Sequence, residues 1–270
     1  MQRALESALA ELALGPEIPP GDPAAIHAWL SRHELAGEDA RAMERDFERW
    51  LVYRTLVRRN LRGALKSTIP RTIARLGARF DADFDALLAL APPVTRLLKD
   101  LTPQFLEFAL PRWARDSALP AYLPDLARHE ALQIELATLL ARPKENVPAQ
   151  LTLDQGVEFI AATRLVHYQW AVHRLPEDEA SRVLPERADV SLLVYRSPEH
   201  EVRYLELGEF AARLLSGVLD ERRTLRVAVA NAASGLGLTL DLPLLNRAAR
   251  LLSELAERGA LLGESDANFV

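Results

Sequence analysis

The chain has 270 residues, of which 49% are hydrophobic and 26% are charged, with 33 Lys and Arg against 38 Asp and Glu. These proportions are those of a folded globular protein and exclude a disordered one. The absence of cysteine excludes a disulfide scaffold, a Cys-ligated zinc site and a thiol nucleophile, and it is typical of the cytoplasm, where we expect this protein. No run of about 18 uncharged apolar residues occurs, so we expect no membrane span.

The first part of the chain is rich in alanine and leucine and is punctuated by prolines, without strand-like alternation. Asp22-Pro23 and Thr102-Pro103 are typical of helix starts. Helices are predicted at 2–14, 22–35, 38–69, 72–76, 80–91, 102–110 and 120–141. We therefore predict an all-helical domain over residues 1–145.

A change in composition at 142–150, RPKENVPAQ, predicts a linker to a second domain at 150–270. VEFIAA and RLVHYQWAVHRL are strand-like, and 189–207 predicts a β-hairpin around Ser197–His200. Helices are predicted at 208–219, 224–233 and 243–258, with Gly259 as the stop and 260–262 as a returning edge strand. The expected fold class is mainly α: an all-helical N-terminal domain and a smaller α+β domain with a hairpin or small antiparallel sheet and winged-helix-like helices.

No motif for catalysis or for metal binding stands out. The chain has no HExxH pair, no G-x-S-x-G elbow, no Walker A loop and no Rossmann fingerprint. His167 and His173 share a face of a regular strand, but no third ligand has useful spacing, so we interpret them as sheet-surface or core histidines. We therefore expect a protein that is not an enzyme, with no catalytic residue, no metal site and no cofactor.

The strongest local feature is a basic stretch, Arg49 to Phe80, with nine Lys and Arg and no carboxylate. Outside it, 33 − 9 = 24 basic residues stand against 38 acidic ones, a balance of −14. Residues four apart lie on one stripe of a helix. The candidate residues for binding a partner or a nucleic acid are Arg54, Arg58, Arg59, Arg62 and Lys66.

This stretch predicts an amphipathic helix with the basic stripe in water and Tyr53, Leu56 and Leu65 on the opposite, apolar side. Three interpretations stay open: a solvated face paired with acidic side chains of the same chain, a docking surface for an acidic protein or peptide, and a nucleic-acid contact. The acidic remainder of the chain and the few aromatic residues in the stretch weigh against nucleic acid.

The hairpin and the last helix suggest a second site. In a winged-helix-like module a sheet edge lies beside a helix, and a peptide can add to such an edge as an extra strand. Residues 200–207 would supply the edge and 244–255 the helix wall. The candidate peptide contacts are Arg203, Tyr204, Leu205, Arg247 and Arg250. A purely structural α+β domain is the alternative.

Several segments resemble a bacterial family, named for a DNA-binding domain, that includes HvfC/BufC-type and methanobactin-type partner proteins of multinuclear non-heme iron oxygenases. The resemblance covers about 40–135 well, on RWLVYRTLVRRNLRGAL, LGARF, APPVTRLLKDLTPQFLEFAL and LPAYLPDLARHEALQIE, and extends more loosely over LLVYRSPEHEVRYLELGEFAARLL and LSELAERGALL. Val52-Tyr53-Arg54 and Asp125–Glu130 are its most specific groups. Thr55-Leu56 stands where members commonly have asparagines.

The resemblance implies a two-domain accessory protein whose C-terminal module captures a ribosomally made precursor peptide and presents it to the oxygenase. The iron would belong to that enzyme, with which this chain would form a heterodimer. The alternative is a DNA-binding transcriptional regulator that uses the basic helix. A purely structural subunit is a third possibility.

Overall fold

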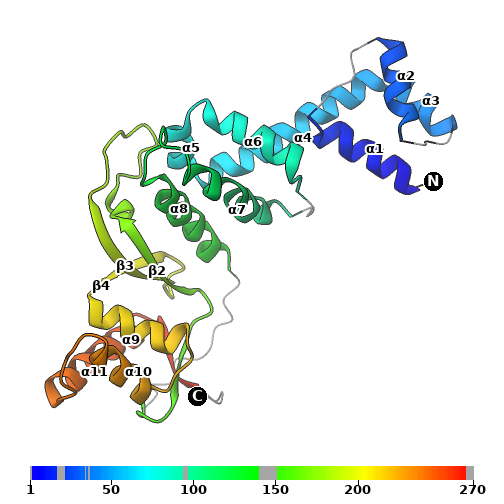
Figure 1. Ribbon diagram of the computed structural model, residues 1–270. Coiled ribbons are helices and arrows are strands. Elements are labelled where there is room, and N and C mark those ends of the chain that lie inside the picture. Colours follow the sequence, from blue (N-terminus) through cyan, green and yellow to red (C-terminus); the bar gives the residue numbers. More distant parts are fainter. Residues whose placement is uncertain are drawn as a thin grey trace. The chain divides into compact units, whose positions relative to one another are not determined.

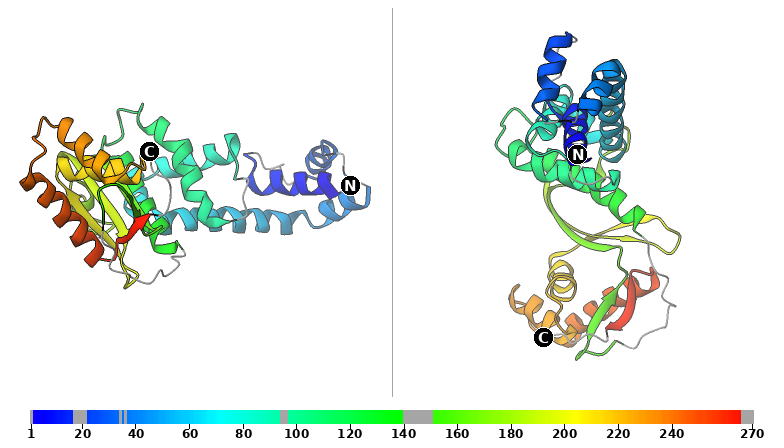
Figure 2. Two further views of the ribbon diagram at one scale, coloured as in Figure 1. Left: turned by 90° about the horizontal axis from the view of Figure 1, so that it is seen from below. Right: turned by 90° about the vertical axis from the view of Figure 1, so that its right-hand side faces the viewer.

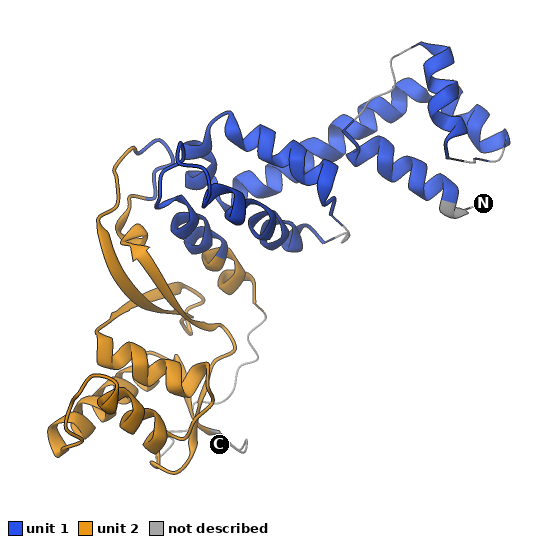
Figure 3. Cartoon of the chain, viewed as in Figure 1, with its two compact units in different colours: residues 1–131, 177–181 blue, residues 132–176, 182–270 orange. Residues whose placement is uncertain are grey.

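The computed structural model describes residues 2–16, 22–33, 35, 37–93, 97–139 and 151–265. The chain divides into two compact units, which Figure 3 colours separately. Unit 1 comprises Met1–Ala131 and Glu177–Ser181, and unit 2 comprises Leu132–Pro176 and Arg182–Val270. The predicted linker at 142–150 lies outside the described residues.

The regular elements that the structure describes in unit 1 are helices (Figure 1). They are α1 (Gln2–Leu14), α2 (Pro23–Ser31), α3 (Gly37–Arg45), α4 (Phe47–Thr68), α5 (Pro70–Leu76), α6 (Arg79–Leu90), the 3-10 helix η1 (Leu98–Asp100), α7 (Leu101–Trp113) and α8 (Leu123–Thr138), the last of which continues into unit 2. The helical character predicted for this part of the chain is confirmed.

Several helix boundaries in unit 1 differ from the prediction. Thr102-Pro103 does not start α7, which begins at Leu101 with Asp100 at its N-cap position, so that Thr102 is buried inside the helix. Asp22 caps α2 as expected, since its side chain accepts a hydrogen bond from the Ala24 N–H at 3.3 Å, but the helix ends at Ser31, not near residue 35. The single helix predicted from residue 38 is two helices, because the backbone leaves the helical region at Asp46 (φ −103°, ψ 18°).

The helix α4 connects two apolar clusters of unit 1. Near its start, Phe47 packs in a cluster with Trp29 and Met43. Near its end, Leu65 lies fully buried in a second cluster with the Phe80 and Phe105 rings. The middle of α4, which carries most of the basic side chains, lies between these two cores.

The Asp125–Glu130 group serves the fold of unit 1. Glu130 is buried and its Oε1 accepts from the Arg71 N–H and Nε at 2.9 and 3.1 Å. Its Oε2 accepts from the Thr72 N–H and Oγ1 at 2.9 and 2.7 Å. A carboxylate at the start of α5 satisfies helix N–H groups that have no partner within the helix.

The described residues of unit 2 form two antiparallel sheets. One has three strands in the order β2 (Thr163–Trp170), β3 (Arg187–Arg196) and β4 (Val202–Leu207), and the other pairs β1 (Gly156–Phe159) with β5 (Leu261–Ser265). The predicted hairpin is confirmed as β3 and β4, with Tyr195 opposite Arg203. The strand predicted to return after Gly259 is β5, and it pairs with β1 in a sheet separate from the hairpin.

Three helices follow the hairpin as predicted: α9 (Glu209–Leu219), α10 (Leu225–Ser234) and α11 (Leu242–Glu257). Figures 1 and 2 show them together on one side of the three-stranded sheet. The core of unit 2 joins Leu193 and Tyr195 of β3 to helix residues such as Leu214 and Leu252. The predicted fold class, mainly α with a small antiparallel β part, is confirmed.

Gly259 ends the last helix for two reasons. Its φ of 72° lies in the left-handed region, and a Cβ there would lie 2.6 Å from Cγ of Pro198 in the hairpin loop. Only glycine meets both conditions without strain. The glycine therefore lets the end of α11 and the hairpin loop lie against each other.

Candidate functional site

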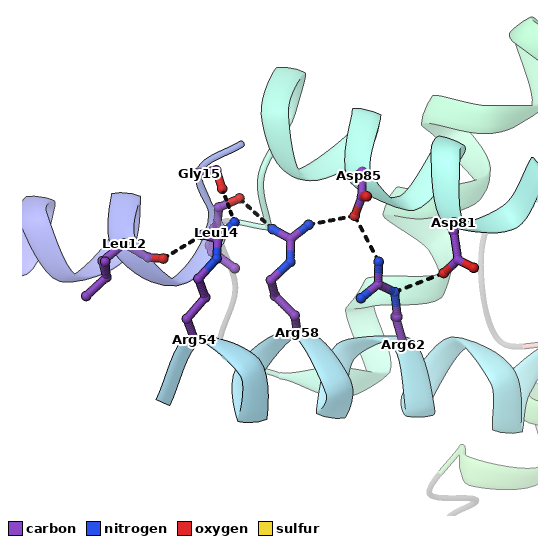
Figure 4. Close-up of polar contacts among 8 residues, drawn as sticks. All are labelled: Leu12, Leu14, Gly15, Arg54, Arg58, Arg62, Asp81 and Asp85. Carbon is purple, nitrogen blue, oxygen red and sulfur yellow. Dashed lines mark hydrogen bonds and ion pairs between the residues drawn. The ribbon is translucent and has the colours of Figure 1, made fainter. Parts of the chain in front are cut away.

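The basic stripe of α4 is largely used inside unit 1 (Figure 4). Arg54 is 5% exposed and donates through Nη1 to the Leu12 carbonyl at 2.6 Å and through Nη2 to the Gly15 carbonyl at 2.8 Å. These carbonyls belong to the end of α1, where the last carbonyl groups have no partner within the helix. Burial lowers the pKa of the Arg54 guanidinium, which still keeps its charge in proteins.

The next two arginines of the stripe link α4 to α1 and α6. Arg58 donates to the Leu14 carbonyl at 3.2 Å and to Oδ1 of Asp85 at 2.6 Å. Arg62 also donates to Oδ1 of Asp85, at 3.0 Å, and its Nε lies 3.2 Å from Oδ1 of Asp81. The interpretation in which the stripe pairs with acidic groups of the same chain therefore describes Arg58 and Arg62.

The exposed and buried faces of α4 differ from the prediction. Arg54 is buried, whereas Tyr53 and Leu56, predicted to face the core, are 47% and 52% exposed. Leu65 is buried as predicted. The reason is that α1 packs against the arginine face of α4, and its terminal carbonyls accept hydrogen bonds from these arginines. The two segments are about 40 residues apart, so hydrophobic periodicity, which is a local signal, could not predict the contact.

Arg59 and Lys66 differ from the other basic candidates. Both are exposed, and the structure shows no ion pair for either within the part of the chain that it describes. Together with Arg54, Arg58 and Arg62 they line one groove of about 1370 Å³ beside α4. The five predicted residues therefore share one groove, but among them only Arg59 and Lys66 have no ion-pair partner or carbonyl acceptor within the described residues.

The second candidate site is the edge of the three-stranded sheet at β4. The Ser197 N–H donates to the Glu201 carbonyl at 2.8 Å, and the Arg196 N–H donates to the Ala162 carbonyl at 3.0 Å. In an antiparallel ladder, directly opposite residues alternate between hydrogen-bonded and non-hydrogen-bonded pairs. The backbone groups of odd-numbered residues of β3 therefore hydrogen-bond to β4, and those of even-numbered residues hydrogen-bond to β2.

This register determines which backbone groups of β4 reach its outer side. Arg203 lies opposite Tyr195 and Leu205 opposite Leu193, so their backbone groups point to β3. The residues whose backbone N–H and C=O groups point the other way are Val202, Tyr204 and Glu206. Within the described residues, no further strand pairs with that side.

The predicted peptide contacts on β4 lie on two faces of the strand. Leu205 packs on the core shared with the helices, and Arg203 lies near the end of α11, in a small groove with Tyr195 and Arg258. Tyr204 points to the opposite face. Arg203 forms an ion pair with Glu201, the residue that ends the hairpin loop.

The predicted helix residues Arg247 and Arg250 lie on α11 and line one shallow groove. The Arg247 guanidinium lies over the Phe210 ring, 5.6 Å from its centroid, and its Nη2 lies 3.6 Å from where a Cβ on Gly208 would be. Arg247 is therefore beside the end of β4, whereas Arg203 is near the other end of α11. The structure brings the helix and the strand together but spreads these arginines along them.

An interaction that the sequence did not suggest lies at the same edge. Glu206 accepts both Nη2 hydrogen bonds of Arg174 at 2.8 Å, and His173 Nε2 lies 3.3 Å from Glu206 Oε2. The hydrogen bond from Arg174 lowers the pKa of Glu206, with a smaller effect from His173. No sequence signal links residues 174 and 206, because the contact depends on the path of the chain between β2 and β3.

The two histidines considered as a metal pair have separate partners. His167 lies 3.8 Å from Asp189 and 3.3 Å from the Ser191 hydroxyl, whereas His173 contacts Glu206. No group of three or more His, Cys, Asp or Glu residues that could hold a metal occurs among the described residues. In the same part of the chain, no helix is long and apolar enough to span a membrane.

The range from just before β2 to the last turn of α11 matches a known protein family. Residues 161–256 match the family model described as the HvfC C-terminal domain. Over these residues the chain is similar to the HvfC C-terminal domain. The match includes the β4 edge, while Val52-Tyr53-Arg54 and Asp125–Glu130 lie outside it. None of the curated proteins matches the chain.

Proposed function

We propose that this chain is a non-catalytic accessory protein that binds a ribosomally made precursor peptide and presents it to a multinuclear non-heme iron oxygenase. The HvfC-type domain supports an accessory role. The observation that carries the proposal is the outer side of β4, where the backbone groups of Val202 and Glu206 point away from β3 and, within the described residues, no further strand pairs. An extended peptide binds such an edge as an additional strand.

In this proposal the peptide backbone supplies most of the affinity, and alternate side chains supply the specificity. Peptide side chains on the α11 side meet Arg203 at one end of the strand and Arg247 at the other. Those on the other side meet Tyr204 and the Arg174–Glu206 pair. We therefore expect leader segments that alternate apolar or acidic residues with less restricted ones.

The iron of the proposed reaction is held by the partner enzyme, and this chain binds and orients the peptide. A heterodimer of the chain with its oxygenase follows from this role. DNA binding by the basic helix is supported less well, because Arg54 is buried and Arg58 and Arg62 contact Asp85. The test therefore also measures binding of the chain to duplex DNA.

The test first looks for an oxygenase and a short Cys-bearing peptide encoded beside this chain, and then measures fluorescence anisotropy of the labelled leader segment of that peptide with and without the oxygenase. Wild type should bind, and Val202→Pro should bind at least tenfold more weakly, because it removes an outward N–H and leaves the ladder to β3 intact. Arg203→Pro is the matched control: it removes an inward N–H and should instead unfold the hairpin.

Two results would count against the proposal: no binding of leader or oxygenase by the wild type, or equal binding by Val202→Pro. Retention on duplex DNA that falls steeply with salt and is lost in Arg59→Ala/Lys66→Ala would favour the regulator instead.

A further inference from the structure

A line of residues on α4 faces solvent along most of the helix. Val52, Leu56, Arg59, Gly63 and Lys66 follow one another at intervals of four, three, four and three residues. This is the spacing at which one helix packs along another. All five are exposed, and the aliphatic side chains of Val52 and Leu56 are 69% and 52% exposed. These five residues are named the α4 seam.

The α4 seam stays exposed because a different face of the helix makes the internal contacts. Arg54, Arg58 and Arg62 hold that face against α1 and α6. Phe47 and Leu65 anchor the two ends of the helix in separate clusters. The seam is thus presented on a helix whose orientation within unit 1 is fixed.

The side chains that line the groove beside α4 give this surface of unit 1 a positive charge. Of the residues that line it, six are Lys or Arg and one, Asp85, is a carboxylate. Oδ1 of Asp85 already accepts hydrogen bonds from Arg58 and Arg62. The positive charge that remains for another molecule comes from two seam residues, Arg59 and Lys66, and from Lys99 across the groove.

We infer that the α4 seam and the groove beside it bind an amphipathic helix, rich in Asp or Glu, of a partner protein. Aliphatic residues of that helix pack on Val52 and Leu56, and its carboxylates pair with Arg59 and Lys66 further along α4. Gly63 between them has no side chain and the space beside it is open, so the partner helix can approach α4 closely there.

The size and the lining of the groove favour this occupant over others. About 1370 Å³ exceeds the volume of common small-molecule pockets, roughly 300–1,000 Å³, and suits a protein segment. On the α4 seam, a nucleic acid would place phosphates against Val52 and Leu56, whose side chains offer no hydrogen-bond donor. Among the described residues, Tyr53 is the one exposed aromatic side chain beside them on which a base could stack. The inference concerns unit 1 and is independent of strand addition at β4, so each can fail alone.

The test is a display library of amphipathic helices, selected on the full-length chain, in which the flanking positions vary among Glu, Gln and Lys. We expect enrichment of Glu on the flanks. The best peptide, measured by fluorescence anisotropy, should bind at least tenfold more weakly to Arg59→Glu/Lys66→Glu and to Gly63→Gln.

Gly63→Gln is informative because it fills the seam without straining the free chain, and it replaces glycine by a better helix former. The matched control is Ala82→Gln, at an exposed position of α6, and Arg115→Glu controls for charge. Both controls should bind the peptide as wild type does, and circular dichroism should show unchanged folding in all variants.

Three results would overturn the inference: no binder in the library, no preference for Glu on the flanks, or binding that is unchanged in Gly63→Gln. Displacement of the peptide by duplex DNA at equal affinity would assign the surface to nucleic acid instead. None of these outcomes would change the binding of a leader peptide at the β4 edge, which is measured separately.

Discussion

Two faces of α4 carry arginine or lysine side chains, yet they differ in what they contact. On one face, Arg54, Arg58 and Arg62 donate to the end of α1 and to the carboxylates of α6. On the other, Arg59 and Lys66 are exposed beside Val52 and Leu56. Charge density alone therefore does not identify a binding surface, since three of these five cations are already used by the fold.

Among the substitutions on the two faces of α4, Arg54→Ala should reduce stability the most. It leaves the buried carbonyl of Leu12 and the part-buried carbonyl of Gly15 without their donors, which should destabilise the packing of α1 by about 2 kcal/mol. Hydrogen exchange of residues 2–16 should rise, whereas Arg59→Ala should leave it unchanged. Unchanged exchange in Arg54→Ala would mean that the apolar contacts alone hold α1.

Asp85→Ala should have an intermediate effect. Asp85 accepts from both Arg58 and Arg62 but is half-exposed, so its removal should cost about 1 kcal/mol or less. Thermal unfolding should show a loss that shrinks as salt is added, because exposed ion pairs are screened. The effect of Arg54→Ala should be almost independent of salt, and equal salt dependence of both variants would contradict the distinction.

Arg59→Ala combined with Lys66→Ala should have the smallest effect on stability, within about 0.5 kcal/mol of wild type, because neither side chain has an ion pair within the described residues. Thermal unfolding measures this directly. A loss as large as that of Asp85→Ala would show that these cations also serve the fold, and would weaken their assignment to a partner.

The sequence predicted the local features of both units well. The alternating runs on either side of Ser197–His200 predicted the hairpin, and Gly259 predicted the end of the last helix, because each depends on residues close in sequence. The prediction of one helix from residue 38 was wrong at Asp46, where no proline or glycine marks the break.

The candidate sites depended more on long-range contacts. Spacing placed Arg54, Arg58 and Arg62 on one stripe, but only the packing of α1 and α6 shows that this stripe faces inward. The candidate contacts on β4 were chosen from neighbouring positions, whereas the register divides Arg203 and Leu205 from Tyr204. The roles of these residues in binding stay predictions.

The sequence by itself determined the helical first half, the hairpin with three helices, and the concentration of positive charge between residues 49 and 80. These follow from periodicity, turn residues and composition, which act over a few residues. Only the tertiary structure decided which cations remain exposed and which side of β4 points outward. Both depend on which distant carbonyls and carboxylates come within hydrogen-bond reach, and this is a property of the packed chain.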